Sequence, residues 1–182
     1  MSDMKVGYAD PPYPGCASLY RDHPDYAGEV DHEALIQTLE REYDGWVLHT
    51  HVPGLRLMER NGWLPEHVRI CSWVKSFAAF KRNVSVAYAW EPVIIKACRK
   101  PVVSKRTIYR DFVETADAVK CPITLKRGLT GAKPESVCHW AFELAGLTLD
   151  DELHDIFPGT GAVTQAWESW KANHASLFDQ TQ

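Results

Sequence analysis

Long apolar runs are missing from this sequence. No stretch approaches the roughly 18 consecutive apolar residues that a membrane-spanning helix needs. The first residues also lack the charged-then-apolar pattern of a secretory signal. We therefore expect a soluble, cytoplasmic protein with no membrane partner.

Closely spaced cysteines are also missing. The five cysteines form no Cys-x-x-Cys motif, and their odd number and wide spacing argue against a disulfide framework or a structural zinc site. They are Cys16, Cys71, Cys98, Cys121 and Cys138. We expect reduced thiols. His49 and His51 have no third ligand near them in the sequence, so we predict no metal site.

Acidic residues are scarce in the middle of the chain. Residues 75–133 contain 13 lysines and arginines but only 4 acidic residues, whereas residues 1–74 have 6 against 12 and residues 134–182 have 1 against 8. Such a positive segment attracts phosphates by Coulomb interaction and counterion release. We predict a nucleic-acid-binding group, with a merely solvated charged surface as the alternative. Its members are Lys96, Arg99, Lys100, Lys105, Arg106 and Arg110.

The chain does contain enough apolar residues for one full core. Its 182 residues are 45% apolar and 11% aromatic, which suits a single domain over residues 1–182. Helices are expected over residues 31–43, 55–61, 135–145 and 162–171, and strands over 5–10, 46–50, 67–75, 85–97 (interrupted at Pro92) and 153–157. Residues 99–133 are irregular, with room for a short helix within 108–119. They are a candidate substrate-recognition segment or lid, with disorder as the alternative.

The first apolar run ends in a carboxylate and two prolines. Residues 5–9 suit a buried strand, and Pro11 and Pro12 cannot continue it because they lack the donor N–H. The strand therefore ends at Asp10, and the prolines hold Asp10 and Tyr13 in a stiff, extended geometry. A rigid loop at the carboxyl end of a strand is where open α/β sheets bind ligands.

A second strand-to-loop pattern lies near the other end of the chain. The strand expected over 153–157 leads into Pro158-Gly159-Thr160-Gly161, and a helix follows. Glycines let the backbone approach a ligand closely and take positive φ, while a helix N-terminus offers free N–H groups. The pattern predicts a site for a nucleotide-like cofactor.

The motif Asp10-Pro11-Pro12-Tyr13 resembles the catalytic motif of the S-adenosylmethionine-dependent methyltransferases that modify exocyclic amino groups of nucleic-acid bases, above all N6 of adenine. Residues 155–161 resemble the cofactor loop of the same family, and Trp90-Glu91-Pro92 and Lys133-Pro134-Glu135 match further parts. The order of the motifs is similar to that of circularly permuted adenine methyltransferases, including small phage and prophage enzymes. The resemblance implies a Rossmann-like α/β fold: a mostly parallel sheet with one antiparallel strand at its far side, and helices on both faces.

The resemblance also implies the site. Asp10, Pro11, Pro12 and Tyr13 would be catalytic, and DNA, or else RNA, would be the partner. S-adenosylmethionine would be the cofactor, held by Lys133 at its methionine carboxylate and by Asp155, Phe157, Gly159, Thr160 and Gly161. The family usually has one more strand after the glycine-loop helix, ending in a residue that holds the ribose. Residues 173–182 are too short and polar to form it.

The chemistry of the first motif agrees with this family. The lone pair of adenine N6 is delocalised into the ring, so a catalyst must pyramidalise that nitrogen and hold it in line with the methyl group. The Asp10 carboxylate and the Pro11 carbonyl can each accept one amino hydrogen, which stabilises the cationic nitrogen as it forms. Tyr13 would stack on the extruded base, a contact worth about 1 to 3 kcal/mol.

Several alternatives stay open at this point. Cytosine N4 poses the same chemical problem as adenine N6, and only the aspartate in place of a serine favours adenine. RNA could replace DNA as the substrate. The chain could also be a catalytically inactive methyltransferase fold that serves as a nucleic-acid-binding subunit, and it could form a homodimer.

Overall fold

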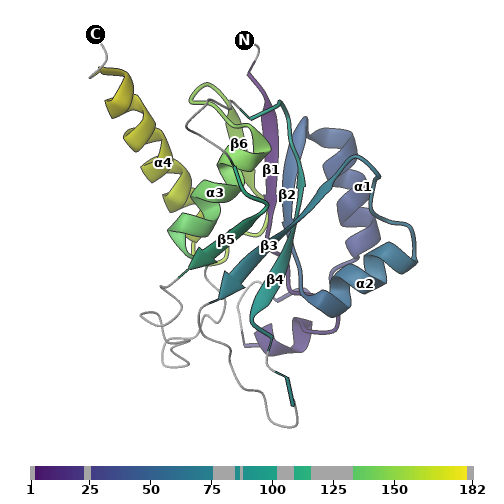
Figure 1. The fold of residues 1–182 in the computed structure, drawn as a ribbon. Coiled ribbons are helices and arrows are strands. Elements are labelled where there is room, and N and C mark those ends of the chain that lie inside the picture. Colours follow the sequence, from purple (N-terminus) through teal and green to yellow (C-terminus); the bar gives the residue numbers. More distant parts are fainter. Residues whose placement is uncertain are drawn as a thin grey trace.

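A single β-sheet organises the chain (Figure 1). The computed structural model describes residues 3–22, 26–75, 85–86, 88–101, 109–115 and 133–179. The strands within these ranges are β1 (Lys5–Ala9), β2 (Gly45–His49), β3 (Arg69–Lys75), β4 (Trp90–Lys96), β5 (Phe112–Thr115) and β6 (Glu152–Asp155). Their order across the sheet is β5-β3-β4-β2-β1-β6.

The strand before Asp10 lies inside the sheet. β1 runs parallel to both of its neighbours, with Tyr8 opposite Val47 of β2 and opposite Asp155 of β6. Because parallel strands end at the same edge of a sheet, Asp10 and the loop after Asp155 meet at the carboxyl edge. The two motifs from opposite ends of the sequence therefore lie side by side.

One strand runs against the others. β4 pairs antiparallel with both β2 and β3, whereas β3 and β5 are parallel. The expected antiparallel strand is therefore present, but it lies between β2 and β3 and not at the far side of the sheet.

Pro92 lies inside β4 and does not interrupt it. Its carbonyl accepts a hydrogen bond from the N–H of Thr50 at 3.2 Å. Because proline has no N–H, β4 lacks only the hydrogen bond that it would donate back to β2, at the point where β2 ends. The expected extension of this strand over residues 85–89 was wrong: 85–86 form a bend, and 88–89 are not in the strand.

The short helix expected within residues 108–119 was also wrong in the part that the structure describes. Phe112–Thr115 form the edge strand β5, in which Thr115 is buried and its hydroxyl accepts a hydrogen bond from Trp73 Nε1 at 2.9 Å. The local pattern was ambiguous, and pairing with β3 decided the conformation. Residues 102–108 and 116–132, most of the candidate segment over 99–133, lie outside the described ranges.

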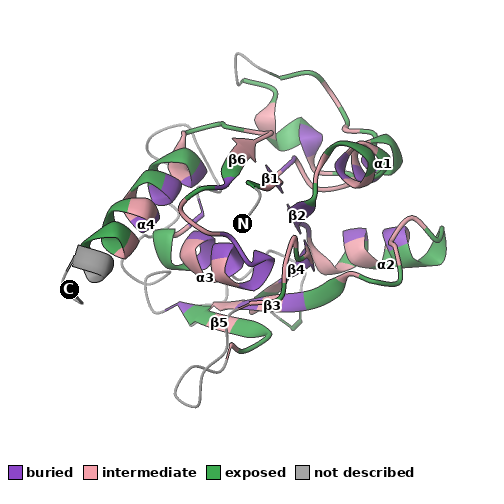
Figure 2. Cartoon of the chain, turned by 90° about the horizontal axis from the view of Figure 1, so that it is seen from above, coloured by how far each residue is buried: buried purple, intermediate pink, exposed green. Residues whose placement is uncertain are grey.

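Helices cover both faces of the sheet (Figure 2). α1 (His32–Glu42) and α2 (Val52–Arg60) lie on one face, and α3 (Glu135–Ala145) and α4 (Ala162–Asp179) on the other. A short 3-10 helix, η1 (Ala17–Tyr20), follows the first motif. Asp31 caps α1 by accepting the N–H of Ala34 at 3.0 Å, and Gly146 ends α3 with a φ of +75°. The expected α/β class, with helices on both faces, is confirmed.

Sheet residues alternate between the two helix layers. Ala9, Trp46, Leu48 and Ile94 pack with α1 and α2, whereas Val6, Tyr8, Val47 and Val93 pack with α3 and α4. Side chains alternate along a strand, so Asp10 follows Val6 and Tyr8 on the α3 side. That alternation brings the carboxylate toward the segment that leads into α3.

Candidate active site

Asp10 is held by a lysine from the other end of the chain. Lys133, just before α3, places its Nζ 2.8 Å from Asp10 Oδ1 and 3.2 Å from Tyr13 Oη. The side chain of Lys133 is only 5% exposed and that of Asp10 19% exposed. This ion pair is therefore largely desolvated. Lys133 makes its polar contacts with the first motif rather than with residues 155–161.

Tyr13 is fixed on two sides. Its hydroxyl donates to Glu91 Oε2 at 2.8 Å, and Glu91 is itself ion-paired with Lys75. The ring of His51 stacks on the Tyr13 ring, with centroids 5.4 Å apart and an interplanar angle of 26°. Lys133 Nζ lies 5.5 Å from the centroid of the same ring.

The sequence analysis missed Glu91, Lys75 and His51 as parts of this site. Glu91 and Lys75 are charged residues within otherwise largely apolar strands, and Trp73 pairs with Glu91 across the β3–β4 ladder. A charged side chain at such a position is a signal that could have found them. The pairing itself could not be read from one strand alone.

Opposite charges in this cluster stabilise the charged forms of Lys133 and Glu91. Burial raises the pKa of Asp10, although the Lys133 ammonium lowers it. Burial lowers the pKa of Lys133, but Asp10 and Glu91 outweigh this and hold it above its ordinary value. Burial raises the pKa of Glu91, but Lys133 and Lys75 outweigh this and hold it below its ordinary value. Lys133 thus remains a cation and Glu91 an anion at neutral pH.

Asp155 lies on the neighbouring strand at the same edge. Its Oδ2 accepts the Thr164 hydroxyl at 3.2 Å, which ties it to the first turn of α4. Its Oδ1 is buried and has no hydrogen-bond partner among the described residues. Burial raises the pKa of this carboxyl. A buried acceptor without a donor is costly unless a ligand supplies one.

The glycine loop presents bare backbone next to Asp155. Gly159 and Gly161 have φ values of +45° and +76°, a conformation that residues with a Cβ rarely adopt. A Cβ at Gly159 would lie 3.8 Å from the Phe157 carbonyl oxygen and one at Gly161 3.8 Å from Gln165 Nε2, so space is open there. Thr160 is exposed, and Phe157 packs partly buried toward α1 and α2.

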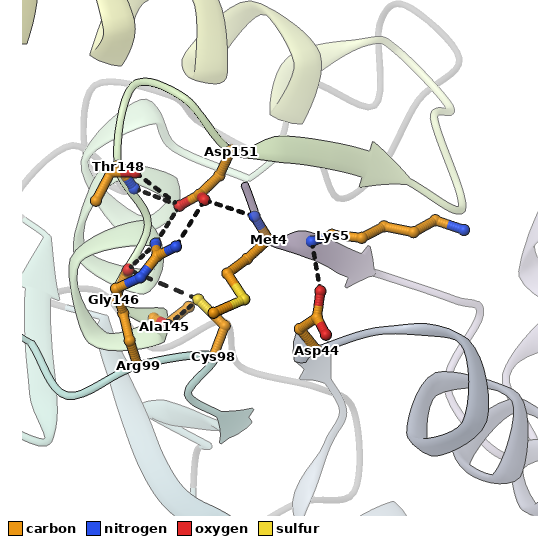
Figure 3. A network of polar contacts seen from close by, with 9 residues as sticks. All are labelled: Met4, Lys5, Asp44, Cys98, Arg99, Ala145, Gly146, Thr148 and Asp151. Atoms are coloured by element: carbon orange, nitrogen blue, oxygen red, sulfur yellow. Dashed lines mark hydrogen bonds and ion pairs between the residues drawn. The ribbon is translucent and has the colours of Figure 1, made fainter. Parts of the chain in front are cut away.

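The predicted nucleic-acid-binding residues do not join this site. Lys96 pairs with Trp46 at the start of β2, so it lies toward the amino edge of the sheet, and its Nζ is 3.4 Å from Glu40. Arg99 forms an ion pair with Asp151 at that edge and donates to the Gly146 carbonyl at 2.9 Å (Figure 3).

The other members of that group are spread out. Lys100 is exposed and follows Arg99, while the guanidinium of Arg110 lies 5.7 Å from the Phe112 ring centroid next to β5. Lys105 and Arg106 lie outside the described residues. The four described members of the predicted group therefore do not form one surface beside Asp10.

The described residues contain neither a membrane-spanning helix nor a metal-binding cluster. They include no helix long and apolar enough to cross a membrane. They also hold no group of three or more His, Cys, Asp or Glu side chains that could bind a metal ion. Of the two histidines considered at first, His49 is buried with its Nε2 2.7 Å from Tyr8 Oη, and His51 caps α2 by accepting the N–H of Gly54 at 3.1 Å.

Comparison with solved structures gives 21 matching chains. No family model and no curated protein matches the chain. It is similar to the crystal structure of an M1.HpyAVI–SAM complex, with a TM-score of 0.53 and 14% identity. The match covers 93% of this chain and 80% of that one. Together with the sheet order, the likeness shows that the two chains share a Rossmann-like α/β fold.

Proposed function

We propose that this chain transfers a methyl group from S-adenosylmethionine to the exocyclic amino group of a nucleic-acid base, preferentially N6 of adenine in DNA. The observation that carries the proposal is the position of the Lys133 ammonium. It is an N–H donor 2.8 Å from Asp10 Oδ1 and beside the Tyr13 ring. A base would need the same two partners: the Asp10 carboxylate to accept a hydrogen from its amino group, and the Tyr13 ring to stack on.

The residues of the second motif fit the proposed cofactor. The buried, unpartnered Oδ1 of Asp155 can accept a hydrogen bond, and the open backbone at Gly159 and Gly161 can lie against a flat or charged ligand. The solved structure that this chain resembles is a complex with SAM, which supports the same cofactor here. When bound, S-adenosylmethionine supplies an electrophilic methyl group on a sulfonium.

The chain's own residues would then activate the amino group. Asp10 accepts one amino hydrogen and the Pro11 carbonyl accepts the other, so negative oxygens surround the nitrogen as it becomes cationic. Because burial raises the pKa of Asp10, this carboxylate is also a better acceptor for the released proton than an exposed aspartate. Glu91 and His51 fix Tyr13, which positions the base.

Lys133 has to leave Asp10 before a base can bind. Its ammonium occupies the acceptor and lies at the hydroxyl end of the Tyr13 ring. A buried lysine moves at low cost only toward another anion. The methionine carboxylate that the resemblance assigns to Lys133 is such an anion, so Lys133 would couple the two subsites.

The proposal is tested by methyl transfer. We expect tritium from labelled S-adenosylmethionine to enter adenine-containing DNA in the presence of the wild type and not of Asp10→Ala. Parallel reactions with RNA, with a cytosine-only strand and with free nucleoside identify the substrate class. Labelling of the cytosine-only strand alone would replace N6 of adenine by N4 of cytosine.

An inactive, nucleic-acid-binding subunit is the second candidate. One observation favours it: β6, which leads into the glycine loop, is the edge of the described sheet, so no further described strand pairs with it there. Calorimetry with S-adenosylmethionine separates the two. No binding to the wild type, even with DNA present, would reject the enzyme and favour the subunit.

A further inference from the structure

An open pocket lies next to the first motif. It has a volume of about 600 Å³, and its lining includes Pro14, Gly15, His51, Arg56 and Arg60. Pro14 and Gly15 directly follow Tyr13, and His51 stacks on the Tyr13 ring. The pocket and the proposed base site therefore share a wall.

The two arginines of this pocket have no anionic partner among the described residues. Arg56 and Arg60 are one turn apart on α2, so they lie on the same face of the helix. Both are exposed, and the described residues provide neither an ion pair nor a hydrogen bond for either guanidinium. Arg99, by contrast, is paired with Asp151.

Close packing between α2 and the loop after Tyr13 fixes the position of the pocket relative to the first motif. A Cβ on Gly54, in the first turn of α2, would come within 2.3 Å of Thr50 Oγ1 and 3.1 Å of Pro14 Cδ. Only glycine lets the helix approach the loop this closely. Arg56 follows Gly54 by two residues, so its place relative to Tyr13 is set by rigid structure.

We propose that this pocket binds a backbone phosphate of the substrate strand, next to the nucleotide whose base reaches Tyr13. This inference rests on the proposed function. Two free guanidiniums match the fork geometry with which arginine binds phosphate oxygens. The volume lies within the range of nucleotide-sized sites. The strand would thus cross α2 at the carboxyl edge and not the amino edge, where Lys96 and Arg99 are engaged with acids.

The test measures binding of an adenine-containing single-stranded oligonucleotide across a salt series. Arg56→Ala/Arg60→Ala should weaken binding at least about 10-fold and lower the slope of log K against log salt by about 0.7, the value for one lost phosphate contact on a single strand. Arg41→Ala/Arg69→Ala removes the same charge from the amino edge and is the matched control. We expect it to bind like the wild type, and both variants to keep their affinity for S-adenosylmethionine.

Other outcomes overturn the inference. Equal binding by the Arg56/Arg60 variant and its control would mean that the pocket holds no phosphate. Loss of binding in Lys100→Ala instead would put the strand at the amino edge. Methyl transfer to a free nucleoside, which has no phosphate, should not change in Arg56→Ala/Arg60→Ala, and an equal loss there would assign the arginines to the base site.

The inference and the proposed function can fail separately. A wild type that methylates nucleoside but binds no oligonucleotide would keep the chemistry and reject the phosphate site. A wild type that binds DNA through Arg56 and Arg60 but does not bind S-adenosylmethionine would keep the phosphate site and reject the proposed methyl transfer.

Discussion

Asp10 and Lys133 form an ion pair that is largely shielded from water. Lys133 is nearly covered, and its ammonium has Asp10, Tyr13 and the field of Glu91 to offset burial. Asp10 gains less, since burial raises its pKa despite the lysine. The pair thus leaves the carboxylate ready to exchange one N–H donor for another.

The first prediction separates the two roles of Asp10. Asp10→Asn should reduce methyl transfer by about 10²- to 10⁴-fold, because the carboxylate that accepts the amino hydrogen is gone. It should also lower the free energy of unfolding by up to about 3 kcal/mol, because Lys133 loses its closest anion. Adding Lys133→Met should restore most of the stability but none of the activity. Urea unfolding and the tritium assay measure the two effects.

The role of the pair would be different if the double variant were no more stable than Asp10→Asn. Lys133 would then be adequately paired by Glu91 alone. Full transfer by Asp10→Asn would remove the carboxylate from the reaction.

At the scale of elements, the glycine loop between β6 and α4 depends on backbone rather than side chains. Gly159 and Gly161 take left-handed φ values beside open space, so their conformation does not arise from crowding. The loop is held from behind by Asp155, whose carboxylate accepts the Thr164 hydroxyl in the first turn of α4. Its outer side is free for a ligand.

The second prediction tests whether the open space beside Gly159 is the cofactor site. Gly159→Val should abolish the rise in melting temperature that S-adenosylmethionine causes, because the new side chain fills the open space. Gly62→Val is the matched control, since Gly62 has a φ of +67° and nothing within 4 Å. Both substitutions should cost about 1 to 2 kcal/mol in strain. If both variants kept the cofactor-induced rise, the loop would not be its site.

Local patterns predicted some elements better than others. The Asp10 and Gly159 motifs could be found because a strand end, prolines and glycines each act on their own neighbours. β5 could not, because Phe112–Thr115 form a strand only by pairing with β3, about forty positions earlier in the sequence. Glu91 and Lys75 were missed for the same reason: their partners lie across ladders. The positive charge of residues 75–133 was read as one surface, but folding turns Lys96 and Arg99 toward acids at the opposite edge.

At the scale of the whole molecule, the amino edge is closed by one ion-paired network (Figure 3). Asp151 accepts the N–H of Met4 at 2.9 Å and that of Thr148 at 2.7 Å, and pairs with Arg99. Arg99 also reaches the Gly146 carbonyl. The network joins the start of β1, the exit of β4, the end of α3 and the turn into β6.

The third prediction concerns acid stability. Burial raises the pKa of Asp151, but Arg99 and the N–H groups of Met4 and Thr148 outweigh it and hold the pKa below its ordinary 3.8. Its contribution to stability is therefore complete above that value and is lost as the pH falls through the lower, folded-state pKa. Asp151→Asn should cost about 2 to 4 kcal/mol at pH 7.

Denaturant unfolding of both proteins at pH 7, 5 and 3 measures this effect. The difference between them should be equal at pH 7 and 5 and shrink at pH 3. Other acids with lowered pKa values, such as Glu91, are present in both proteins and cancel in the difference. A constant difference at all three values would mean that Asp151 is not held ionised by its partners.

The place of β1 between β2 and β6 has a consequence for synthesis. β2 follows β1 within some forty residues, but the contact from Met4 to Asp151 spans 147 positions. At about 5 to 20 residues per second, a ribosome needs roughly 7 to 30 s to cover that distance. During this interval β1 presents one row of unpaired N–H and C=O groups, a state that invites pairing with other chains. The glycine loop directly follows β6, so it is synthesised together with the strand that completes the sheet. A nascent chain therefore covers the open edge of β1 only when it also acquires the glycine loop.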